Sequence, residues 1–221
     1  MEDNIYTKYF EKRNRSLKDL DQDNNSRRVF ETFNSALEYF NHNVINKNDN
    51  LLDIGCGDGS FINFLKKIGI NSNGYDVNDG INFENDKFPN IDNSIDHVVT
   101  NSVIEHIYNP NNFLNEIKRI LKKNGNLIIV TPNFRFSFKE FYDDPTHVKP
   151  YTEESLKKIL KMYEFENIKI LPWFVKKPQI YWKIPKNFLL GSLIPFRGDA
   201  SKLIPEFLKG QTKSLLAICK K

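Results

Sequence analysis

Cysteines, glycines and long apolar runs are all scarce in this chain of 221 residues. Its two cysteines are too few for a disulfide framework, which argues against a small secreted scaffold. No apolar run approaches the roughly 20 residues of a membrane-spanning helix. The N-terminal residues lack a basic region followed by an apolar one, so we expect no signal peptide and a cytoplasmic location. Cysteine and histidine do not occur at the paired spacing of a zinc site, so we also expect no metal.

The net charge of +4 hides an uneven distribution along the chain. From Lys157 to Lys221 there are 14 basic against 4 acidic residues, which is +10, and the whole-chain counts of 32 and 28 leave 18 against 24, or −6, for the rest. Two interpretations stay open. The C-terminal third faces an anionic partner, or its lysines only keep the surface solvated.

Three of the ten glycines, Gly55, Gly57 and Gly59, alternate within one short stretch. The apolar run before them is typical of a buried parallel strand, and the apolar residues of 61–68 recur at helical spacing. A glycine turn between strand and helix favours a bound ligand, because glycine tolerates positive φ and close approach. It is not a dinucleotide fingerprint, since Ser60 replaces the last glycine of G-x-G-x-x-G, and no Gly-Lys-Ser/Thr follows as in a phosphate loop.

A second predicted strand, 70–77, carries Asp76 near its end. An acid at this place can accept both hydroxyls of a ribose, and Asp76 lies about twenty residues beyond the glycines, as that role requires. The alternative is a solvated acid at the end of a strand. The stretch 78–93 that follows is short, is broken by Gly80 and Pro89 and shows no helical pattern, so 82–84 is at most the remnant of a strand.

The pattern Asp-x-Gly-x-Gly-x-Gly at 53–59 resembles the first motif of class I methyltransferases that use S-adenosylmethionine (SAM). A longer match consists of Ile-Asp-His-Val-Val at 95–99, Val-Ile-Glu-His-Ile at 103–107 and the run 116–127 that ends in Lys-Lys-Asn-Gly-Asn-Leu. In this order the blocks resemble the small-molecule branch of the family, the type 11 methyltransferase domain, from Leu51 to Asn133.

The resemblance implies SAM as the cofactor and a set of residues that contact it. The glycine turn would pass under the methionine end, and Asp53 would orient the turn or reach the SAM amino group. Asp76 would hold the ribose, and Asn101 or Ser102 would lie beside the sulfonium. The full set that we expect to bind the cofactor is Asp53, Gly55, Cys56, Gly57, Gly59, Asp76, Val77, Asn101 and Ser102.

The expected fold is α/β, a Rossmann-like doubly wound seven-stranded sheet that is mostly parallel, with an antiparallel last strand. Residues 1–48 would form an N-terminal helical cap with Tyr6 and Tyr9 as lid aromatics, and 49–221 the SAM-binding domain. An insertion at 175–212 would separate the sixth and seventh strands. Its aromatic and aliphatic residues alternate with lysines, which indicates either peripheral membrane contact or packing over the sheet edge or a dimer partner.

Two histidines are the catalytic candidates. His147 lies in a long aromatic and acidic loop after the fifth predicted strand, and His106 lies beside the end of the fourth. Ligands of open α/β sheets bind at the carboxyl ends of the strands. A histidine, whose ordinary pKa is about 6.5, can accept the proton of a hydroxyl group there. Each can instead be a structural histidine that bonds a loop carbonyl or orients SAM, and these alternatives stay open.

The sequence thus predicts a SAM-dependent methyltransferase of EC class 2.1.1. The acceptor would be a small molecule or glycan, such as a sugar or lipid-linked glycan, with oxygen as the first choice of atom. DNA is not expected, because 100–103 reads Thr-Asn-Ser-Val instead of the Pro-Pro motif of nucleobase amine methyltransferases, and neither cysteine suits attack on a pyrimidine. The alternatives are an RNA methyltransferase that uses the basic C-terminal region and a non-catalytic scaffold.

Overall fold

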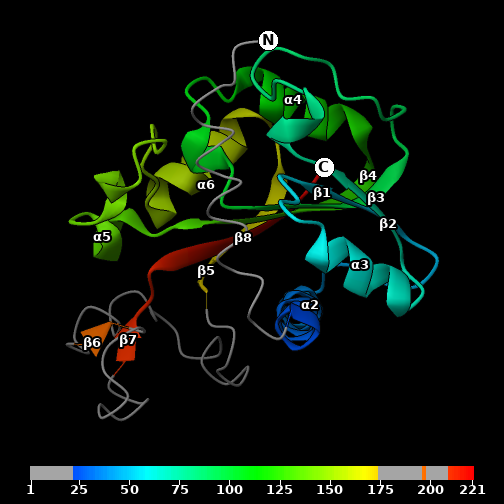
Figure 1. The fold of residues 1–221 in the computed structure, drawn as a ribbon, viewed down its shortest axis with the longest axis horizontal. Helices are drawn as coiled ribbons and strands as arrows, with labels where there is room; N and C mark the ends of the chain where they lie inside the picture. The colour runs from blue at the N-terminus through cyan, green and yellow to red at the C-terminus, as the bar shows by residue number, and fades with distance from the viewer. Residues whose placement is uncertain (1–21, 174–195, 198–208) are drawn as a thin grey trace.

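The computed structural model describes residues 22–173, 196–197 and 209–221, which build a doubly wound α/β fold (Figure 1). Its central six-stranded sheet has the order β2-β1-β3-β4-β8-β5. The strands are β1 (Asn50–Ile54), β2 (Asn71–Tyr75), β3 (Ile95–Asn101), β4 (Leu121–Pro132), β5 (Glu166–Pro172) and β8 (Ser214–Lys220). The first four run parallel, and β8 lies antiparallel between β4 and β5.

The predicted fold class is confirmed, but the sheet has six described strands where seven were expected. The strand that is lacking is the third in chain order. Residues 77–94 contain only a 3₁₀ turn, η1 (Val77–Asp79), so β2 stays at the edge of the sheet. A parallel strand needs a crossover connection of a dozen or more residues, and this stretch is too short to hold both a helix and a strand.

The short connection between β2 and β3 contains no α-helix and is held by packing of aromatic side chains. Phe83 and Phe88 are buried against each other and against Phe113 of α4 (Asn111–Ile120), with ring centroids 6.1–6.3 Å apart. The guanidinium of Arg119 donates to the carbonyls of Phe88 and Asn90, each at 2.9 Å. Arg119 therefore ties two carbonyls of the loop to α4, and Asn112 of the same helix donates to the Phe83 and Asp86 carbonyls at 3.2 and 2.8 Å.

Helices cover both faces of the sheet (Figure 1). On one face lie α2 (Gln22–Tyr39) and α3 (Ser60–Lys67), and on the other α4 and α6 (Glu153–Met162). Each face has its own hydrophobic cluster. Phe33 and Leu65 belong to the first, and Phe113 and Leu156 to the second, all with 0% exposure. The apolar stripes of these helices thus account for the two layers of the core.

The predictions for the two least regular segments concern residues that lie largely outside the described part of the chain. Tyr6 and Tyr9 lie there, as does most of the 175–212 insertion. Within it, β6 (Phe196–Arg197) and β7 (Lys209–Gln211) pair in parallel as a separate two-stranded sheet. Within the described part of the chain, no helix has the length and apolar character needed to cross a membrane.

Candidate active site

A cavity of about 690 Å³ opens where β1, β2 and β3 end. A volume in this range is typical of sites for cofactors and small molecules. The residues of the predicted cofactor set that line it are Asp53, Gly55, Cys56, Gly57, Asp76, Val77, Asn101 and Ser102. Gly59 is not among the lining residues and instead forms the N-cap of α3. One cavity therefore gathers predicted residues from Asp53 to Ser102, which are 49 positions apart in the sequence (102 − 53).

The glycine turn has a backbone that other residues rarely adopt. Gly55, Gly57 and Gly59 have φ of 80°, 57° and 74°, all in the left-handed region. A β carbon on Gly55 would also collide with the side chain of Val103. Both backbone conformation and space therefore require glycine at Gly55, and the turn remains open on the side of the cavity.

Hydrogen bonds hold both the side chain and the main chain of Asp76. One of its carboxylate oxygens accepts from the Gly57 N–H at 3.1 Å. Its main-chain N–H donates to Asp79 at 2.7 Å, as part of a capping box that begins η1. The carboxylate thus joins the glycine turn to the end of β2, at the wall of the cavity.

The floor of the cavity is acidic. Asp53 is 5% exposed, and burial, reinforced by the nearby charge of Asp76, raises its pKa to about 7. Burial and the same acids raise the pKa of Cys56 to about 12, so its thiol stays protonated and is not a nucleophile. Among the described lining residues there is no lysine or arginine. The cavity therefore favours a cationic group near Asp53.

The end of β3 contributes a residue in a strained conformation. Ser102 has φ of 57°, and its N–H donates to the carbonyl of Val130 at 2.9 Å, which holds the backbone in this conformation. Non-glycine residues in the left-handed region are uncommon and cluster at functional sites. Ser102 and the exposed Asn101 both face the cavity.

Two groups of residues outside the predicted cofactor set also line the cavity. The first comes from α2 and consists of Gln22, Asn25, Ser26, Val29 and Phe33. The second is the 80–84 stretch of the short connection. The carboxylate of Glu84 accepts the N–H groups of Tyr108 and Asn109 at 3.1 and 2.9 Å. The amphipathic pattern of α2 indicated a buried face but not which part of the sheet it would cover.

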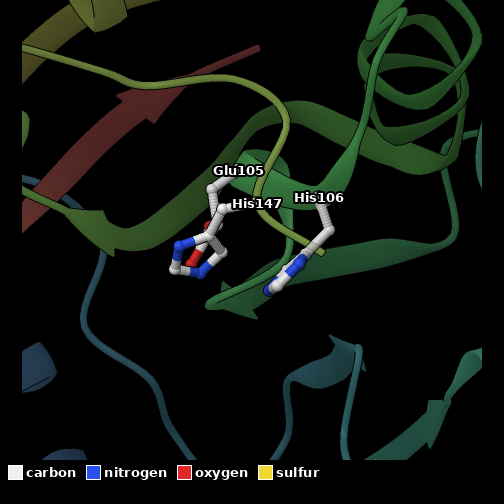
Figure 2. Close-up of side chains that lie close together, drawn as sticks. All are labelled: Glu105, His106 and His147. Carbon is white, nitrogen blue, oxygen red and sulfur yellow. The ribbon is translucent and has the colours of Figure 1, made fainter. Parts of the chain in front are cut away.

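The two catalytic candidates lie side by side, although only one of them lines the cavity. His106, at the end of η2 (Ile104–His106), lines it, and His147 does not. Their ring centroids are 4.8 Å apart, and Figure 2 shows both rings beside Glu105. The loop of His147 is held on η2 because the main-chain N–H groups of Val148 and Lys149 donate to the Glu105 carbonyl at 2.9 and 3.0 Å.

Hydrogen bonds to Nδ1 indicate the same tautomer for both histidines. His147 Nδ1 lies 2.6 Å from the Phe141 carbonyl, so it must be the donor. The Thr146 hydroxyl donates to Asp144 at 2.5 Å and must therefore accept from His106 Nδ1, 2.9 Å away. A second contact of His106 Nδ1, to the Thr146 carbonyl at 3.1 Å, requires the same proton. The lone pair of each neutral ring is therefore on Nε2.

Comparisons with known proteins agree with this architecture. Residues 12–170 match the family model of a methyltransferase domain. An uncharacterized protein of Methanocaldococcus jannaschii is 30% identical over 204 residues, which cover 85% of this chain and 84% of that one. Similar solved structures include a SAM-dependent methyltransferase from Archaeoglobus fulgidus, with a TM-score of 0.57, 23% identity and coverage of 87% and 94%. Another is the complex between the Haloferax volcanii Trm112 methyltransferase activator and a methyltransferase, with a TM-score of 0.58, 14% identity and coverage of 94% of this chain and 93% of that one. The chain belongs to the methyltransferase-domain family and is a SAM-dependent methyltransferase.

Proposed function

We propose that this methyltransferase transfers the methyl group of SAM to a hydroxyl oxygen of a small molecule or glycan. The observation that carries this proposal is the histidine pair next to the cofactor cavity. His106 lines the cavity, and its ring lies 4.8 Å from that of His147. A hydroxyl acceptor needs a group that removes its proton, and imidazole is suited to this near neutral pH.

The lining residues support one orientation of SAM. Asp76 would hold the ribose, and the glycine turn would contact the methionine end. The exposed apolar side chain of Val77, 46% accessible, would lie against the adenine. Asp53 would stabilise the ammonium group of the methionine end. Asn101 and Ser102 would flank the sulfonium, and the methyl group would then point towards His106. The position of α2 along the cavity supports the division into a cap, 1–48, and a SAM-binding domain, 49–221.

Methyl transfer from a sulfonium is an in-line displacement in which the O–C bond forms as the C–S bond breaks. The protein must align the acceptor and remove the hydroxyl proton. Since Nδ1 of both histidines donates to the loop, the lone pair that can accept that proton is on Nε2. Their bonds to Thr146 and Phe141 would keep the rings oriented during the reaction.

An RNA acceptor is less well supported. The described lining of the cavity contains no lysine or arginine, whereas phosphate backbones are bound mainly through such residues. The basic C-terminal region and its proposed contact with a membrane or lipid-linked acceptor lie largely outside the described residues. A protein of similar fold forms a complex with a methyltransferase activator. A protein partner is therefore a second kind of partner that we propose for this chain.

The test is transfer of a labelled methyl group from SAM to a panel of phenols, sugars and lipid-linked glycans. We expect a methyl ether as the product. His147→Gln and His106→Gln should each lower kcat by about 10²- to 10⁴-fold, the usual contribution of a general base, without weakening SAM binding. The matched control is His97→Gln, at the opposite edge of the sheet, which should retain the wild-type rate. A nitrogen-methylated product, or unchanged kcat in both histidine variants, would contradict the proposal.

A further inference from the structure

We propose that Glu105, His106 and His147 bind a divalent first-row transition-metal ion, with zinc as the first candidate. This proposal rests on the proposed function only for the chemical role of the ion. The binding itself can be tested without any acceptor.

The three side chains converge from two separate segments of the chain. One potential ligand atom from each lies within 4.8 Å of the others. Figure 2 shows the Glu105 carboxylate beside the His147 ring, with His106 adjacent. Zinc bonds nitrogen and oxygen at about 2.0–2.2 Å, so tetrahedral ligand atoms lie roughly 3.4 Å apart. Small rotations of the two half-buried imidazoles would close this difference.

The hydrogen bonds around the histidines are those expected behind metal ligands. A metal-bound histidine usually donates its second ring N–H to a carbonyl or carboxylate, which fixes its tautomer. His147 does so to the Phe141 carbonyl at 2.6 Å. His106 donates to the Thr146 hydroxyl, which in turn donates to Asp144. In both rings the lone pair that can bind an ion is therefore on Nε2, and Nε2 of His147 lies 3.9 Å from a carboxylate oxygen of Asp144.

Glu105 completes the donor set as its anionic member. Its side chain is fully buried, and its Oε2 accepts the hydroxyl of Thr131 at 3.0 Å. A divalent cation would compensate the charge of a carboxylate at this depth. Two imidazoles and one carboxylate are a ligand set of catalytic zinc, in which the fourth position remains open for water or substrate. Because His106 lines the cavity, that open position would be accessible from it.

The ion would take over the removal of the acceptor proton. As a Lewis acid it lowers the pKa of a bound hydroxyl, whose proton then passes to water. The alkoxide oxygen attacks the methyl carbon, and the electrons of the broken C–S bond remain on sulfur. The products are the methyl ether and S-adenosylhomocysteine, without any change of oxidation state.

The experiment titrates chelator-treated full-length protein with Zn²⁺ by calorimetry and with Co²⁺ by visible absorption. We expect one ion per chain and the intense absorption of four-coordinate Co²⁺. His147→Gln and Glu105→Gln should weaken binding by at least about 100-fold. Thr146→Val keeps all three ligands but removes the acceptor of His106 Nδ1, and it should weaken binding by about 10- to 100-fold. The control is Asp143→Asn, an exposed acid of the same loop, which should bind as the wild type does.

Thermal melting of each variant without metal shows whether it is folded. Zn²⁺ should raise the Tm of the wild type and of Asp143→Asn but not that of the ligand variants. Absence of stoichiometric binding, or binding unaffected by His147→Gln and Thr146→Val, would overturn the metal site. If methyl transfer then still falls in His147→Gln and is unaffected by chelator, the proposed function stands without the ion. If the ion binds but no acceptor is methylated at oxygen, the metal site stands and the proposed function does not.

Discussion

At the scale of single residues, Asp53 shows how burial changes the protonation of a carboxyl group. Desolvation raises the pKa of its carboxyl to about 7, so about half of the free protein carries a proton there at neutral pH, and more does so below it. The sulfonium and ammonium groups of SAM are cations that would favour the ionised form. If Asp53 reaches them, cofactor binding must be coupled to the release of a proton.

We therefore predict that SAM affinity falls as the pH is lowered from about 7 to about 5.5, approaching tenfold per pH unit. The sign follows because the ionised carboxylate binds SAM better and is lost below its pKa. Calorimetry in buffers of different ionisation enthalpy should detect the released proton. Asp53→Asn should remove both the pH dependence and the proton release. Equal pH dependence in the variant would show that Asp53 does not contact the cofactor charges.

Residue patterns in the sequence were enough to bring together the residues of the cavity at the strand ends but not to give the surroundings of the histidines. Gly55, Gly57 and Asp76 could be predicted, because local backbone conformation and strand ends bring them together. The 4.8 Å approach of His106 to His147 could not, because it depends on how a loop folds back onto η2. For the same reason, the proposed metal ligands, which come from two separate segments, do not show the short ligand spacing of a metal-binding motif in the sequence.

At the scale of elements, the short connection after β2 replaces regular structure by side-chain packing. The sequence indicated correctly that 78–93 holds no helix, while the expectation of seven strands came from the family pattern. What the sequence did not show is that Arg119 of α4 would bind this loop through the Phe88 and Asn90 carbonyls. Arg119 also pairs with Glu116 at 2.7 Å, and both side chains are mostly buried.

We predict that Arg119→Met lowers the free energy of unfolding by about 2–4 kcal/mol, because it leaves the Glu116 carboxylate without its cation and the Phe88 and Asn90 carbonyls without their donor. The neighbouring Lys118 is the matched control. It pairs with Glu164, which is 84% exposed, so Lys118→Met should cost less than about 1 kcal/mol. Urea denaturation measures both variants. Equal losses would mean that the loop does not depend on Arg119.

At the scale of the whole molecule, the carboxyl and amino ends of the strands carry different groups of residues. The carboxyl edge holds the cavity and the histidine pair. At the amino edge, His97 is buried between Asn126 of β4 and Asp49, with hydrogen bonds of 3.1 and 3.2 Å. Burial lowers the pKa of His97 despite the nearby Asp49 carboxylate. This edge therefore holds strands together through a neutral imidazole.

The lowered pKa predicts a loss of stability in acid. Below about pH 6.5 the His97 side chain binds a proton in the unfolded chain but not in the folded protein. The free energy of unfolding therefore decreases as the pH is lowered, by up to about 1.4 kcal/mol per pH unit, until the pH reaches the pKa of His97 in the folded protein. Urea denaturation of the wild type and His97→Gln between pH 7.5 and 5.5 tests this, and the variant should show the smaller slope. The raised pKa of Asp53 acts in the opposite direction but equally in both proteins. Parallel slopes would exclude His97 as the source.

We expect the cavity at the strand ends to bind SAM through Asp76. The decisive measurement is a calorimetric titration with SAM of the wild type, of Asp76→Ala and of Asp58→Ala, in which an exposed acid of the same cavity is replaced. We predict micromolar binding to the wild type and to Asp58→Ala. Loss of the two ribose hydrogen bonds should weaken binding to Asp76→Ala by about 100-fold. No binding to the wild type, or equal affinity in both variants, would contradict the account.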